Sequence, residues 1–134
     1  AAFDAIDLDF SEIIVEDINV SHAGNDCVDV SSGRYTILQA RVLDCGDKGL
    51  SVGEKSELIA QHVSVERADI AVSSKDFSIV HIEELDGKFI RNCFEVYQKK
   101  QEFGGARLVI ENTNCLNPNN VDAYSSLIIK SDVF

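Results

Sequence analysis

The chain has 134 residues and a formal net charge of −11, and 45% of its residues are hydrophobic. This length fits a single domain. The excess of acidic residues argues against nucleic acid and anionic membrane surfaces as partners, because both bind clustered lysine and arginine. No apolar stretch approaches the roughly 18 residues of a membrane span, so the sequence predicts no membrane insertion.

A short segment of alternating hydrophobic and polar residues returns along the chain, first as Ile6-Asp7-Leu8 and then as Val28-Asp29-Val30. The first hydrophobic residues of successive copies are 22, 22, 20 and 24 residues apart. Alternation with a period of two indicates β-strands, and self-similarity at a period in the twenties indicates a solenoid. The residues expected to stack in one inward column are Ile6, Val28, Leu50, Ile70 and Phe94.

Two further apolar runs follow the first in most repeats, as in 13–15 and 18–20. Three short strands at about 3.3 Å per residue close a coil with three flat sides, and successive coils stack about 4.8 Å apart. The runs are rich in valine and isoleucine, which suit pleated sheet. The sequence therefore predicts an all-β fold, a right-handed parallel β-helix of about five turns with three short strands per turn; the hand follows the general preference of parallel crossovers.

The first repeat begins near residue 3, and a solenoid requires capping at its ends. We therefore expect a single β-helix domain over 1–134 that is a fragment or module of a larger protein. A homo-oligomer formed through an uncapped end is the alternative.

The chain contains four cysteines, Cys27, Cys45, Cys93 and Cys115. Cys27 and Cys93 occupy the same strand position three turns apart, and three turns of about 4.8 Å exceed the limit of about 7 Å between bridged Cα atoms. Cys45 and Cys115 are related in the same way. All four are therefore predicted to be reduced and buried as small hydrophobic side chains.

Three segments carry a family resemblance: Asp4-Ala5-Ile6-Asp7, Asn25-Asp26-Cys27-Val28 and the glycine-rich stretch 46–53. They resemble right-handed parallel β-helix proteins of the pectin-lyase-like superfamily, and their order is similar to that of polygalacturonase-type glycosidases. The resemblance implies that Asp4 and Asp26 correspond to two of three catalytic aspartates. The sequence departs from the family pattern at Asn25, where an aspartate is needed, and at Lys48, near the position of a histidine.

Inverting glycoside hydrolysis requires an acid and a base carboxylate about 6.5–9.5 Å apart, acting in a groove. Because the chain departs from the catalytic pattern and has few turns to form a groove, the sequence predicts no catalytic site. It favours a noncatalytic β-helix module for carbohydrate or protein contact in an extracellular or cell-envelope protein. The alternative is a partial or degenerate polysaccharide-active enzyme, a glycosidase or lyase, that uses Asp4 and Asp26.

Asp7 and Asp29 fall one turn apart at the same strand position. Stacked carboxylates repel each other, and calcium prefers several oxygen ligands. The sequence predicts no cofactor and no metal site, with calcium on Asp7 and Asp29 as the alternative.

An insertion separates the first and second strands of the fifth turn, and it begins at Tyr97 and continues to residue 105. Insertions in repeat proteins often lie on the binding face. Lys99 and Lys100 stand between Tyr97 and Phe103 on an otherwise acidic chain. These four residues are predicted to bind an anionic polysaccharide or a partner protein. In the alternative, the loop caps the coil, with Phe103 packed and the lysines paired with acids.

Overall fold

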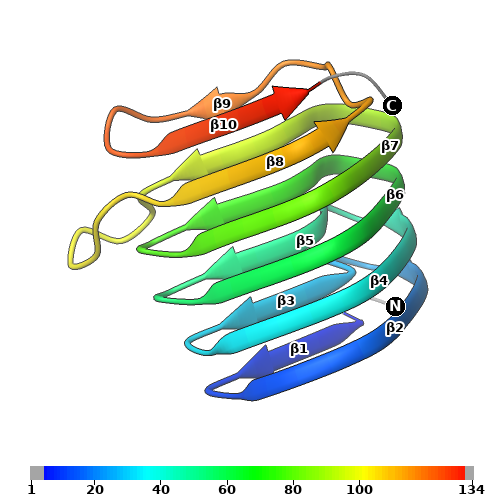
Figure 1. Cartoon of the computed structure of the whole chain (residues 1–134), viewed down its shortest axis with the longest axis horizontal. Helices are drawn as coiled ribbons and strands as arrows, with labels where there is room; N and C mark the ends of the chain where they lie inside the picture. The colour runs from blue at the N-terminus through cyan, green and yellow to red at the C-terminus, as the bar shows by residue number, and fades with distance from the viewer. Residues whose placement is uncertain (1–4, 132–134) are drawn as a thin grey trace.

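The structure is a computed structural model that describes residues 5–131. These residues form ten strands and no helix. The strands are β1 (Ile6–Asp9), β2 (Glu12–Ala23), β3 (Val28–Ser31), β4 (Arg34–Cys45), β5 (Lys48–Gly53), β6 (Glu57–Lys75), β7 (Ile79–Tyr97), β8 (Arg107–Thr113), β9 (Asn120–Val121) and β10 (Ser126–Ser131). All pair in parallel and stack as a β-solenoid of about six coils (Figure 1). The predicted all-β parallel solenoid is therefore confirmed, with a sixth coil supplied by β9 and β10.

Each complete coil presents three sides, because the long strands bend as they pass from one side to the next. We call the sides the first, second and third faces. The first face contains 6–9, 28–31, 50–53, 72–75, 94–97 and 120–121. The second face contains 12–16, 34–38, 57–61, 79–83, 107–111 and 126–130. The third face contains 18–21, 40–43, 63–66 and 85–88.

The inward columns of the first face form the centre of the core. One column runs through Ile6, Val28, Leu50, Val72 and Phe94, so that every step is 22 residues. The prediction that Ile70 belongs to this column is wrong, because Ile70 pairs with Lys48 and Asn92. Ile70 and Val72 are two residues apart and satisfy the same alternation, and the pairing register selects Val72.

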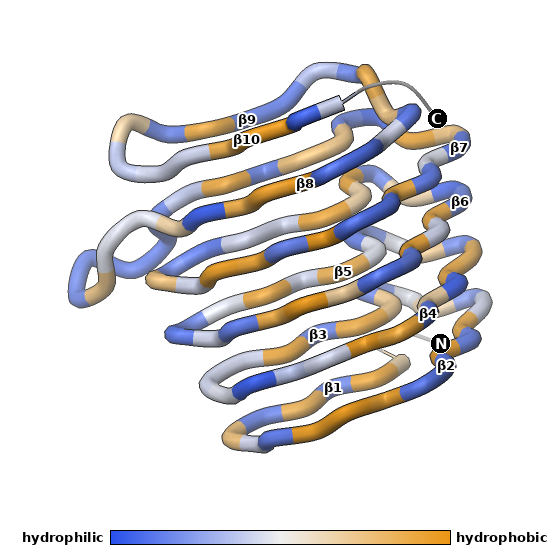
Figure 2. The backbone as a smooth tube through the Cα atoms, in the orientation of Figure 1, coloured by the Kyte–Doolittle hydropathy of each residue, from blue (hydrophilic) through white to orange (hydrophobic). Residues whose placement is uncertain are grey.

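Hydrophobic and hydrophilic residues alternate along the strands (Figure 2). Leu50, Leu58, Leu85 and Phe94 are fully buried, so all three faces contribute large side chains to one interior. Residues 5–131 contain no helix long and apolar enough to cross a membrane.

Two corners of the coil turn through left-handed backbone at residues other than glycine. The first corner, between the first and second faces, has positive φ at Phe10, Ser32, Glu54, Lys55, Asp76 and Phe77. The third corner, between the third and first faces, has positive φ at His22, Asp44, Arg67 and Phe89. Left-handed backbone costs roughly 1–2 kcal/mol per non-glycine residue. Its recurrence at the same place in successive coils indicates that stacking of the coils imposes this conformation.

The cysteines form two disulfides, Cys27–Cys45 and Cys93–Cys115, with Cα atoms 5.3 Å and 5.8 Å apart. The prediction of four reduced cysteines is wrong. Equivalent cysteines three coils apart are indeed too distant to bridge. However, each coil closes on itself, so the cysteine near its beginning meets the cysteine near its end.

Candidate functional site

Polar side chains gather in two outward columns on the first face, on the opposite side of the strands from the core. The first column contains Asp7, Asp29, Ser51, Ser73, Glu95 and Asn120. The second contains Asp9, Ser31, Gly53, Lys75 and Tyr97. Ser51 and Ser73 are buried although they point outward, so longer side chains cover the middle of this face.

Lys75 is at the centre of this arrangement. Its side chain passes over Gly53, where an added Cβ would lie 3.1 Å from Lys75 Cε. The Lys75 ammonium donates to Ser51 Oγ at 3.3 Å. An ammonium has three N–H donors, and none of the ion pairs within residues 5–131 includes Lys75. Lys75 is therefore a partly buried cation with hydrogen-bonding capacity left for a ligand.

Burial and two neighbouring lysines make the positive charge on Lys75 unfavourable. Burial lowers the pKa of Lys75, and the positive charges of Lys48 and Lys99 lower it further, against the opposing effect of Asp29 and Asp26. The surroundings therefore disfavour the charge on Lys75. A bound anion would compensate for both the burial and the neighbouring cations.

Around Lys48, by contrast, the neighbouring carboxylates outweigh burial and favour the charged ammonium. The Lys48 ammonium forms an ion pair with Asp47 at 2.7 Å and its side chain is 15% exposed. Burial alone would lower the pKa of Lys48, but the hydrogen bond to Asp47 and the charges of Asp26 and Glu95 outweigh burial and raise it. Lys48 thus has an ion-pair partner, whereas Lys75 forms no ion pair within residues 5–131.

Tyr97 follows Lys75 in the same column, one coil later. Burial and the charge of Glu95 raise the pKa of Tyr97. Ser73 donates to Glu95 Oε1 at 2.9 Å. The predicted residue Tyr97 therefore lies next to Lys75, on the same face as the hydrogen-bonded pair of Ser73 and Glu95.

The insertion joins β7 to β8 and projects beyond the other corners as the yellow loop in Figure 1. The buried carboxylate of Asp76 accepts the backbone N–H groups of Lys99 and Lys100 at 2.7 Å and 3.0 Å. The Lys100 ammonium pairs with Glu54, two coils earlier in the stack. Phe103 packs edge-on against Phe77, with ring centroids 6.0 Å apart. The loop therefore folds back along the first corner.

The four predicted binding residues fall into two groups, one at the first face and one that holds the loop on the coil. Tyr97 joins the first face and the Lys99 side chain is exposed beside it, whereas Lys100 and Phe103 hold the loop on the coil. Sequence reasoning found these residues from the insertion and missed Lys75. Lys75 is the last residue of the first-face segment 72–75, and this position can be recognised only once the register of the fourth coil is known.

The aspartates singled out by resemblance have a structural role where they are described. Asp26 is 5% exposed and accepts the backbone N–H of Lys48 at 3.1 Å. Asp4 lies outside the described residues. Asp7 pairs in register with Asp29, as the repeat indicated. No cluster of three or more His, Cys, Asp or Glu side chains within residues 5–131 is placed to hold a metal ion.

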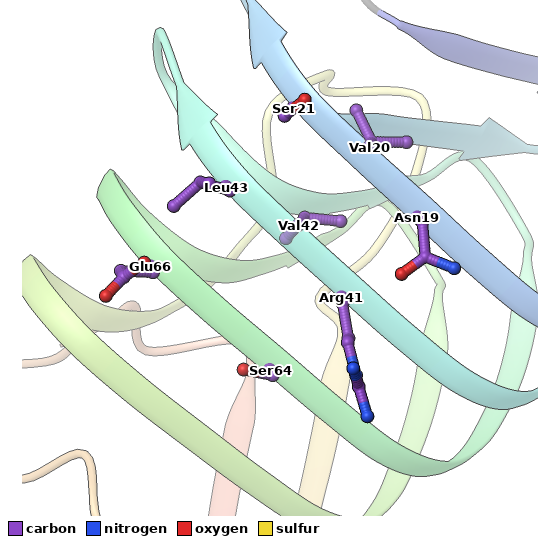
Figure 3. Close-up of a pocket in the computed structure, with 8 residues that line it drawn as sticks. All are labelled: Asn19, Val20, Ser21, Arg41, Val42, Leu43, Ser64 and Glu66. Carbon is purple, nitrogen blue, oxygen red and sulfur yellow. The ribbon is translucent and has the colours of Figure 1, made fainter.

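A shallow hollow of about 380 Å³ lies on the third face. Asn19 on β2, Arg41 on β4 and Ser64 on β6 spread side by side over it rather than converging on one point (Figure 3). Asn19 and Arg41 are exposed to solvent. Within residues 5–131, the third face has no partly buried cation comparable to Lys75 on the first face.

The chain matches no family model, no curated protein and no solved structure.

Proposed function

We propose that the chain is a noncatalytic β-helix module whose first face contacts acidic carbohydrate. Lys75 carries this proposal, because its partly buried ammonium has one hydrogen bond within the chain, and burial together with Lys48 and Lys99 outweighs the carboxylates of Asp29 and Asp26. A carboxylate on a sugar supplies both the negative charge and the oxygen acceptors that Lys75 requires.

The rest of the first face suits a saccharide better than an isolated anion. Polar side chains repeat along its outward columns at each coil, about 4.8 Å apart. Tyr97 and the exposed Lys99 extend the polar surface on one side of Lys75, and Ser31 extends it on the other. An extended chain of sugar hydroxyls and carboxylates can contact successive coils of such a face.

The resemblance to β-helix proteins of the pectin-lyase-like superfamily also supports carbohydrate as the ligand class. The two disulfides favour an oxidising compartment, which supports an extracellular or cell-envelope location. Asp26 is buried against the backbone of Lys48, which supports contact without cleavage. Protein contact through the same face is the alternative to carbohydrate.

Replacing Lys75 by methionine is expected to weaken binding of a hexameric oligogalacturonate by about tenfold to a hundredfold. A hydrogen bond to a charged group contributes about 1.5–3 kcal/mol, which corresponds to this change in Kd. Isothermal titration calorimetry at low salt measures the change. The matched control is Lys88→Met, because Lys88 is an exposed lysine on the third face.

The proposal requires that the Lys88→Met protein bind like the unaltered chain. Equal affinities of the Lys75→Met and Lys88→Met proteins would contradict it, as would an unaltered chain that binds no oligogalacturonate. Release of reducing ends from the oligomer would contradict its noncatalytic part.

A further inference from the structure

A second hollow, of about 620 Å³, lies at the first corner, next to the first face. It is in the size range of small-molecule sites. Its lining comes from the first three coils and from the insertion loop, and consists of Phe10, Ser32, Gly33, Arg34, Glu54, Lys55, Glu57 and Phe103. Chain segments far apart in the sequence thus line one open hollow.

Two aromatic side chains line the hollow. Phe10 belongs to the first coil and is 80% exposed, although a phenylalanine gains most from burial. Phe103 comes from the insertion loop and is fixed by edge-on contact with Phe77, at an interplanar angle of 88°. Phe10 therefore offers an uncovered ring, and Phe103 is held in place before any ligand arrives.

The second coil contributes Ser32, Gly33 and Arg34 to the hollow. A Cβ on Gly33 would lie 2.1 Å from the backbone oxygen of Ser11, so only glycine fits there. Ser32 and Gly33 add little side-chain bulk, which leaves room in this part of the hollow for a ligand.

The polar groups of the hollow include one available cation. Arg34 pairs with Glu57 at 3.4 Å, and Glu54 pairs with Lys100. The Lys55 ammonium lies 5.5 Å from the centroid of the Phe103 ring. Among residues 5–131, no carboxylate forms an ion pair with Lys55.

We propose that this hollow is a subsite for one sugar residue that carries a carboxylate. The apolar face of the sugar ring packs against Phe10 and Phe103, and the carboxylate pairs with Lys55. The ring hydroxyls hydrogen-bond the Arg34–Glu57 pair. An apolar peptide would leave these charged groups desolvated without partners, which is unfavourable.

The subsite rests on the proposed function and extends it around the first corner. Gly53, over which Lys75 passes, is two residues before Lys55 in the chain. A saccharide bound at Lys75 can therefore continue directly into the hollow. The two sites together predict recognition of at least two consecutive acidic sugar residues.

The test compares Phe10→Gly with Phe89→Gly. The two phenylalanines are matched, because they are 80% and 75% exposed and have φ angles of 51° and 57°. Glycine adopts this backbone conformation readily, so neither substitution is expected to lower the melting temperature. Phe89 lies at the third corner and lines no part of the hollow.

Phe10→Gly is expected to weaken binding of hexameric oligogalacturonate about fivefold to tenfold, and Phe89→Gly to leave Kd unchanged. Lys55→Met is expected to weaken binding of the oligogalacturonate and to leave binding of its fully methyl-esterified form unchanged. Calorimetric titration of each variant with both oligomers measures these effects.

The outcomes separate the subsite from the proposed function. If Lys75→Met weakens binding while Phe10→Gly and Lys55→Met do not, the subsite is wrong and the function at the first face stands. If the unaltered chain binds neither oligomer, both proposals are overturned. Loss of binding in Phe89→Gly equal to that in Phe10→Gly would also overturn the subsite.

Discussion

Replacing Leu50 by aspartate is expected to unfold the chain. Leu50 is fully buried, in register between Val28 and Val72 in the central inward column. A carboxylate at this position has no partner, and leaving a charge buried and unpaired costs roughly 3–5 kcal/mol or more. Lost packing adds a further 2–5 kcal/mol. The total is comparable to the entire net stability of a typical domain, about 5–15 kcal/mol.

Ile59→Asp is the control for this substitution. Ile59 lies on β6 but points away from the core and is 53% exposed. A charge there remains in water, and the free energy of unfolding should change by about 0.5 kcal/mol or less. Urea denaturation followed by circular dichroism compares the two variants. A Leu50→Asp protein as stable as Ile59→Asp would contradict the register of the solenoid.

Removing the two disulfides is expected to produce the second-largest loss of stability. The bonds close segments with sequence separations of 18 and 22 residues. Loops of this length correspond to about 3 kcal/mol each in the chain-entropy description. The double variants Cys27→Ser/Cys45→Ser and Cys93→Ser/Cys115→Ser should therefore each lower the free energy of unfolding by about 2–4 kcal/mol in urea titrations.

Thiol titration in denaturant without reductant tests the pairing directly. The oxidised protein should yield no reactive thiol, and four should appear after reduction. Equal stability of the oxidised and reduced proteins would show that the bonds do not constrain the unfolded chain. Four reactive thiols before reduction would contradict the pairing itself.

The repeat architecture could be predicted from sequence because period-2 alternation and a period near 22 residues both point to stacked parallel strands. The exact register of the fourth coil could not be predicted from the sequence. Ile70 and Val72 have equal hydrophobic character, and only pairing with Leu50 on one side and Phe94 on the other distinguishes them. The cysteine pairing was missed for a related reason, since it depends on how each coil closes rather than on how coils stack.

The candidate site was predictable only where the sequence breaks its own pattern. The insertion after Tyr97 identified Lys99, Lys100 and Phe103, because irregular segments stand out against a repeat. Lys75 lies inside a regular segment, and its distinction depends on burial and on the charge of Lys48 in the neighbouring coil. Phe10 lines the same hollow as Phe103 only because the insertion folds back along the first corner. Neither the burial of Lys75 nor the position of Phe10 in this hollow can be read from the spacing of residues along the chain.

The most direct measurement is a two-dimensional NMR titration of the isotopically labelled chain with hexameric oligogalacturonate. The proposed function predicts that the amide signals of Ser51, Ser73, Lys75, Tyr97 and Lys99 shift in a saturable manner. Asn19, Arg41 and Ser64 on the third face (Figure 3) should keep their positions. Saturable shifts confined to the third face, or no shifts on the first face at saturating oligomer, would contradict the assignment of the first face as the carbohydrate-contact surface.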